Sequence, residues 1–68
     1  MYEFYVVIER DEDGMFVGEV PQLPGCYSQG KTIDELLQNM REVIELCLEE
    51  IDEVDFLPEF IGVQKVIV

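Results

Sequence analysis

The stretch TIDELLQNMREVIELCLEEIDEV, residues 32–54, decides the fold of this chain of 68 residues. Its apolar residues recur at steps of three and four, the spacing of one face of an amphipathic helix. They are Ile33, Leu36, Leu37, Met40, Val43, Ile44, Cys47, Leu48, Ile51 and Val54. Thr32 suits the N-cap, and Glu35 follows three residues later, as in a capping box. The pattern predicts a helix of about five to six turns with an apolar stripe that needs a sheet to cover.

Three strands are expected before this helix, over residues 2–10, 15–20 and 26–29. A loop formed by residues 12–14 joins the first two and pairs Ile8 with Gly18, which keeps the apolar side chains on one face. A two-residue turn would instead pair Ile8 with Glu19. We therefore expect Gly14 in the left-handed conformation, which its missing Cβ permits.

A fourth strand is expected over residues 60–68, after Pro58 ends the helical pattern. A right-handed crossover can place it parallel beside the first strand. The expected fold is therefore a single α+β domain, residues 1–68, in the order β-β-β-α-β, with a mixed four-stranded sheet (strand order 3-2-1-4) and one helix across one face. Two apolar sets are expected to pack together: Leu37, Met40, Ile44, Cys47 and Leu48 from the helix, and Phe4, Val6, Ile8 and Val20 from the sheet.

The charge is strongly one-sided, with 16 acidic residues, 4 basic residues, no histidine and a formal net charge of −12. Direct binding to nucleic acid is not expected, because phosphate binding needs clustered Lys and Arg. The acidity favours either a basic protein partner or simple solubility. No apolar run approaches the length of a membrane span, so the chain is expected to be cytoplasmic, with no membrane partner.

The two cysteines, Cys26 and Cys47, are not spaced as a metal-binding pair. They are interpreted as small buried side chains in a reducing compartment, with a disulfide between them as the alternative.

A phosphate-loop pattern is matched by residues 25–32, but its context argues against nucleotide binding. Two prolines, Pro21 and Pro24, stand where a buried strand should precede the first glycine. A calcium loop that began at Asp11 would need Gly at its sixth position and Glu at its twelfth, but these positions are Phe16 and Gln22, so residues 11–14 are interpreted as a solvated hairpin tip. Without a histidine as base or metal ligand, neither enzymatic activity nor a cofactor is expected.

Acidic residues crowd the C-terminal turns of the helix, where the helix dipole favours cations. Together with the hairpin tip, they are the predicted partner-binding residues: Asp11, Asp13, Glu49, Glu50, Asp52 and Glu53. The alternative is a solvated helix end in an acidic protein. The helix covers only one face of the sheet, so a second set is predicted to form an oligomer contact: Tyr5, Val7, Val17, Val66 and Val68.

The chain resembles the HicB-like antitoxin family, in its N-terminal domain. The resemblance covers about Tyr5 to Glu50 and rests on the acidic hairpin tip before Gly14, the segment 19–26, the segment 30–35 with the capped helix start, Asn39 and the run 42–45. It implies a truncated ribonuclease H-like fold without that enzyme's carboxylate cluster. It also implies neutralisation of a small basic HicA-type toxin that cleaves messenger RNA. Typical members continue into a DNA-binding domain, and no such domain is expected here.

Two functional hypotheses follow. The first is an antitoxin-like protein-binding module that covers the RNA-binding surface of a HicA-like toxin. The second is a non-catalytic homo-oligomer, a dimer or tetramer with a regulatory or structural role and no toxin partner. A neighbouring reading frame for a small basic protein would favour the first hypothesis.

Overall fold

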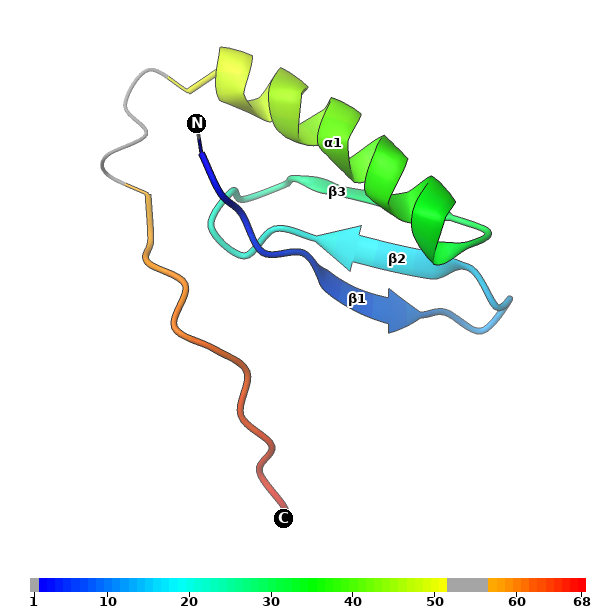
Figure 1. The fold of residues 1–68 in the computed structure, drawn as a ribbon. Coiled ribbons are helices and arrows are strands. Elements are labelled where there is room, and N and C mark those ends of the chain that lie inside the picture. The colour runs from blue at the N-terminus through cyan, green and yellow to red at the C-terminus, as the bar shows by residue number, and fades with distance from the viewer. Residues whose placement is uncertain (1, 52–56) are drawn as a thin grey trace.

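The computed structural model describes residues 2–51 and 57–68 and has three strands followed by one helix. The elements are β1 (Val7–Arg10), β2 (Phe16–Glu19), β3 (Tyr27–Gly30) and α1 (Ile33–Glu49). The strands form an antiparallel sheet in the order β1-β2-β3, and α1 lies across one face of it (Figure 1). The α+β class and the order of the first four elements are confirmed.

The hairpin between β1 and β2 has the predicted register, with Ile8 opposite Gly18. The amide of Asp11 donates to the carbonyl of Met15 at 2.9 Å, so residues 12–14 form the loop. Gly14 has a φ of +84°, the left-handed conformation that glycine adopts without steric cost. The side chain of Asp11 accepts hydrogen bonds from the amides of Asp13 and Met15, each at 2.9 Å, and so stabilises the loop.

The connection between β2 and β3 sends apolar side chains into the core, although its prolines and glycine mark it as a loop and are themselves exposed. The amide of Val20 donates a hydrogen bond to the carbonyl of Cys26 at 3.0 Å. Two tight turns lie within the segment, because the amide of Leu23 donates to the carbonyl of Val20 and the amide of Cys26 donates to the carbonyl of Leu23. The side chains of Leu23 and Cys26 are almost fully buried. This loop therefore contributes to the core, a role that the sequence pattern did not indicate for Leu23.

Helix α1 begins as predicted and ends earlier than predicted. The Thr32 hydroxyl accepts a hydrogen bond from the Glu35 amide at 3.0 Å. At the other end Glu50 is the C-cap, and the amide of Ile51 bonds to the carbonyl of Leu48 at 3.3 Å in a tightened last turn. Consecutive acidic residues at this end oppose the helix dipole, which explains the early stop. The predicted final position, Val54, lies outside the described residues.

The core lies between α1 and the β2–β3 side of the sheet. Its buried members are Val20, Leu23, Cys26, Leu36 and Met40. The predicted packing is confirmed for Met40 and Val20, and five more of the predicted residues are partly buried against this core: Phe4, Val6, Ile44, Cys47 and Leu48. It is wrong for two residues, since Leu37 is 44% exposed and Ile8 is 38% exposed. The helix packs on β3 and β2, so the β1 side of the sheet stays uncovered.

Residues 57–68 contain no strand, so the predicted fourth strand beside β1 is not formed within this chain. The Phe60 ring packs against Tyr5, with 5.0 Å between ring centroids, near the start of β1. Beyond this contact the extended chain leads away from the sheet instead of along its edge (Figure 1). The mixed sheet of order 3-2-1-4 is thus corrected to a three-stranded antiparallel sheet. We call residues 60–68 the C-terminal arm.

Candidate protein-binding surfaces

The predicted partner-binding residues do not form one site. The hairpin tip and the C-terminal end of α1 lie at opposite ends of the domain (Figure 1). Asp52 and Glu53 lie outside the described residues. The two acidic groups therefore have to be considered as separate surfaces.

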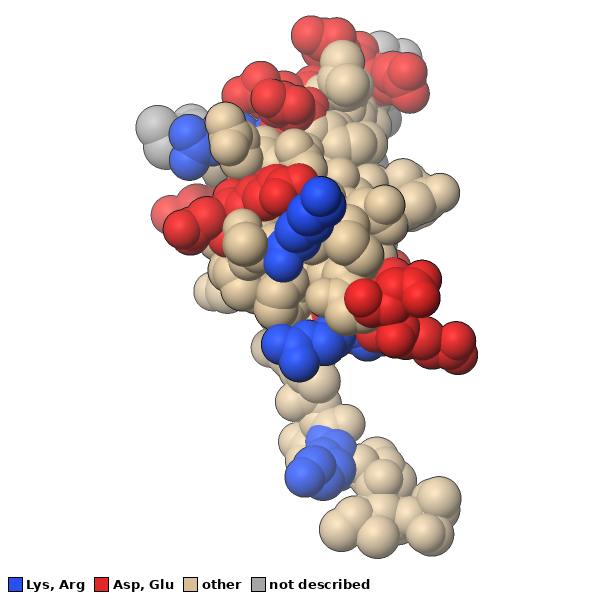
Figure 2. Space-filling model, turned by 90° about the vertical axis from the view of Figure 1, so that its right-hand side faces the viewer, with Lys and Arg blue, Asp and Glu red and all other residues tan. Residues whose placement is uncertain are grey.

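The hairpin end carries charges of both signs. Asp13 is exposed, whereas one carboxylate oxygen of Asp11 is engaged in the loop. The start of α1 lies at the same end and adds exposed Asp34 and Glu35 (Figure 1). Figure 2 shows basic side chains between the acidic groups on this side of the molecule. This mixture makes the hairpin end a weaker candidate for a basic partner.

The solvent-facing side of α1 carries a more uniform acidic surface, which we call the acidic ridge: Glu42, Glu45, Glu49 and Glu50, with Leu46 among them. All four carboxylates are exposed, and the last turn of α1 contains no basic residue. Residues three and four apart are neighbours on a helix, so Leu46 adjoins Glu42, Glu49 and Glu50. The Leu46 side chain is 60% exposed. The sequence interpretation included Glu49 and Glu50 but missed Glu42, Glu45 and Leu46.

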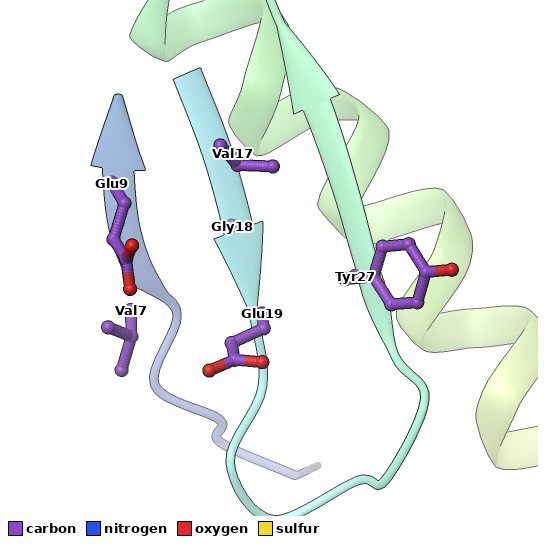
Figure 3. A pocket seen from close by; sticks show the side chains of 6 residues that line it. All are labelled: Val7, Glu9, Val17, Gly18, Glu19 and Tyr27. Atoms are coloured by element: carbon purple, nitrogen blue, oxygen red, sulfur yellow. The ribbon is translucent and has the colours of Figure 1, made fainter. Parts of the chain in front are cut away.

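The face of the sheet away from α1 contains part of the predicted oligomer contact. Val7 and Val17 line a shallow hollow of about 270 Å³ on this face, flanked by Glu9 and Glu19 (Figure 3). Tyr5, which is exposed, precedes β1. The other two predicted members, Val66 and Val68, lie in the arm, which leads away from the sheet in this chain (Figure 1).

An open groove of about 780 Å³ lies between α1 and the segment that leads into β1. Its lining is mainly apolar, with charged residues among the apolar ones: Tyr2, Glu3, Phe4, Val6, Leu37, Met40, Arg41, Ile44, Glu45 and Leu48. This is the side of α1 on which the fourth strand was expected. The exposure of Leu37 follows from this opening.

The two cysteine thiols are free and lie next to each other. Burial raises the pKa of the Cys26 thiol to about 12, and its hydrogen bond with the Cys47 side chain acts in the same direction. A thiol of that pKa is protonated at neutral pH and is a poor nucleophile.

Metal binding and membrane insertion find no support in the part of the chain that is described. Among residues 2–51 and 57–68, no group of three or more His, Cys, Asp or Glu side chains could hold a metal ion. No helix formed by these residues has the length and apolar character to cross a membrane.

Comparison with known proteins gives a consistent family. Residues 4–67 match the family model described as HicB-like antitoxin of bacterial toxin-antitoxin system. A UPF0150 protein of Synechocystis is 74% identical over 66 residues, which cover 97% of this chain and 94% of that protein. UPF0150 proteins of Archaeoglobus fulgidus and Thermotoga maritima are 53% and 38% identical over 64 residues, covering 94% and 93% of this chain and 91% and 85% of their own lengths. The chain therefore belongs to the family of HicB-like antitoxins.

Proposed function

We propose that this chain is an antitoxin-like protein-binding module, which neutralises a small basic HicA-type toxin by covering the surface that binds messenger RNA. The observation that carries the proposal is the acidic ridge of α1. Its Glu49 and Glu50 stand where the helix dipole disfavours negative charge, so stability does not account for them.

The chemistry of the toxin's substrate explains why an acidic surface would inhibit it. A protein that cleaves RNA binds the phosphate backbone through Lys and Arg, so its binding surface is positively charged. The carboxylates of the acidic ridge present the same sign of charge as the phosphates. Leu46 gives the ridge an apolar centre, and an apolar centre with a polar rim is the usual anatomy of a protein interface.

The hairpin end is proposed to act at an earlier stage of toxin binding than the acidic ridge, when the two proteins approach each other. Asp13 is exposed and far from the ridge, so it would contribute to long-range attraction of a basic protein instead of close contact. The net charge of −12 strengthens this attraction and opposes direct binding to nucleic acid. We assign the protein a non-catalytic role, without a cofactor, in the cytoplasm where messenger RNA is found.

The proposal is tested with the purified product of a neighbouring reading frame for a small basic protein. Isothermal titration calorimetry should give a complex with the wild-type chain. The double change Glu42→Lys and Glu49→Lys should weaken the complex by about a hundredfold, since truncating or reversing interfacial charge pairs costs several kcal/mol. A matched control, Glu19→Lys, changes an exposed charge on the opposite face of the sheet and should leave the affinity within about threefold. Equal losses for ridge and control variants would contradict the assignment of the ridge.

A second function is favoured by the exposed arm. A homo-oligomer with a regulatory or structural role and no toxin partner would use the arm and the open side of the sheet. The absence of any binding between the wild-type chain and the neighbouring basic protein would favour this alternative.

A further inference from the structure

The C-terminal arm has the properties of a strand that lacks its sheet. It is extended and leaves the body of the domain (Figure 1). Its aliphatic side chains are largely exposed, with Val63 at 78%, Ile67 at 88% and Val66 at 75%. An exposed apolar strand with unpaired backbone groups is a site for association with another chain.

The body of the same chain offers a vacant place for one strand. β1 pairs with β2 on one side only, so its other edge has unpaired backbone groups within the sheet. The 780 Å³ groove beneath α1 opens on the β1 side, where Leu37 is exposed and Val6 and Ile44 are only partly buried. A strand added to the β1 edge would supply hydrogen bonds to that edge and apolar side chains to the groove.

The residue pattern of the arm fits this place on both faces. Successive side chains of a strand point to opposite faces. Ile61, Val63 and Ile67 therefore share one face, which suits the apolar groove, together with Lys65. The groove lining includes the carboxylate of Glu3, whose charge is opposite to that of Lys65. The other face, with Val66 and Val68, would extend the open side of the sheet next to Val7.

The contacts at the start of the arm direct it away from the β1 edge of its own chain, so this edge is not the one with which the arm pairs. Phe60 is held against Tyr5, and the preceding Pro58 and Glu59 lie beside Pro21 and Gln22. From this base the arm leads away from the β1 edge of its own chain (Figure 1). Each chain thus contains both a strand-forming arm and an open β1 edge, but the two do not meet within the chain.

The charge of the arm identifies a second copy as the occupant. Residues 60–68 contain no Asp or Glu and one lysine, in a chain of net charge −12. This stretch can approach another copy without adding to their mutual repulsion, whereas a basic partner would be repelled by Lys65 and attracted by the acidic ridge. Exchange of identical arms is reciprocal and closes with two-fold symmetry.

We infer that the chain is a strand-exchanged homodimer, in which the arm of each copy lies along β1 of the other and completes a four-stranded sheet. The inference does not rest on the toxin proposal, because it uses the arm and the β1 side of the domain instead of the acidic ridge. It brings together the predicted contact residues Tyr5, Val7, Val66 and Val68 across two chains.

Sedimentation equilibrium of the full chain alone tests the dimer. The wild type should be a dimer, and Ile67→Lys, which places a charge toward the apolar groove, should weaken association by at least about tenfold. The control Leu46→Lys makes the same kind of change at an exposed position of the acidic ridge and should leave the dimer intact. A monomeric wild type, or a dimer that Ile67→Lys does not affect, would overturn the inference. Circular dichroism shows whether each variant keeps its helix.

A mixture of ¹³C-labelled and unlabelled wild-type chains tests the exchange itself and needs no variant. Isotope-filtered NMR should show contacts between the Ile67 methyl groups of one chain and Val6 or Ile8 of the other. Arm-to-β1 contacts found only within one chain would mean that the arm closes on its own sheet and would overturn the exchange. Because no toxin is present, these outcomes are independent of the binding experiment on the acidic ridge.

Discussion

Substitution of Gly30 by alanine tests the packing between sheet and helix on which the fold depends. A Cβ atom at this position would lie 2.6 Å from the Leu36 nitrogen, 2.9 Å from the Leu36 Cα and 3.0 Å from the Glu35 carbonyl carbon. All three are backbone atoms of the first turn of α1, so no side-chain rotation relieves the clash. The start of α1 would have to move away from β3, and Leu36, which is fully buried, would move with it.

The size of the effect follows from overpacking. Extra methyl groups in a well-packed core cost about 1–3 kcal/mol, and a clash with backbone places this case near 3 kcal/mol. A domain of this size has a stability of roughly 3–5 kcal/mol from its core, so Gly30→Ala should remove most of it. The close approach of α1 to β3 also explains why glycine occupies position 30 of the phosphate-loop pattern: the packing of the helix leaves no room for a Cβ atom there.

Urea unfolding followed by far-ultraviolet circular dichroism measures this loss at one fixed protein concentration. The control is Gln38→Ala, which places the same residue at an exposed position of α1 outside the arm. The control should stay within about 0.5 kcal/mol of the wild type, as is usual for surface changes. A Gly30→Ala chain as stable as the control would refute the proposed contact.

Three further predictions concern the helix cap, the buried thiol and the hairpin tip. Thr32→Ala should reduce the free energy of unfolding by about 1 kcal/mol, because the Glu35 amide loses its acceptor, and Thr32→Ser should restore most of it in the same urea assay. The Cys26 thiol has a pKa of about 12 in the fold against 9.0 for an ordinary thiol, so its contribution to stability is constant below pH 9 and declines as pH rises from there toward 12. Urea midpoints should therefore fall more steeply between these pH values for the wild type than for Cys26→Ala, and parallel curves would show that the thiol is not buried. Asp13→Lys should slow association with a basic toxin and leave the dissociation rate unchanged in stopped-flow mixing at low salt, whereas an altered dissociation rate would place Asp13 in the contact.

Much of the fold could be predicted because its signals are local. The loop at Gly14, the register of Ile8 with Gly18 and the cap at Thr32 each depend on a few neighbouring residues. The choice between Leu36 and Leu37 as the buried residue could not be made this way. Adjacent apolar positions both fit a helical stripe, and the position of the sheet beneath the helix decides which of them is covered.

The arm shows a different limit of sequence patterns. Its residues have the composition of a strand, but a strand also needs an edge to pair with, and that edge is distant in sequence. Within this chain the arm does not reach β1. The pattern therefore identified the segment as strand-forming without identifying its partner.

The candidate site was predicted only in part for a similar reason. The unfavourable charges at Glu49 and Glu50 stand out because they oppose the helix dipole. Glu42, Glu45 and the exposed Leu46 give no such signal, since acidic residues on a helix surface are common. Their grouping becomes visible only when the exposed side of α1 is known.

Cleavage of messenger RNA by the cognate basic toxin, measured with increasing amounts of this chain, tests most directly whether the acidic ridge covers the toxin's RNA-binding surface. Cleavage should fall to zero when the chain equals the toxin in concentration, and the variant with Glu42→Lys and Glu49→Lys should fail to protect the RNA at the same concentration. Undiminished cleavage at a saturating excess of the wild-type chain would contradict the proposed function.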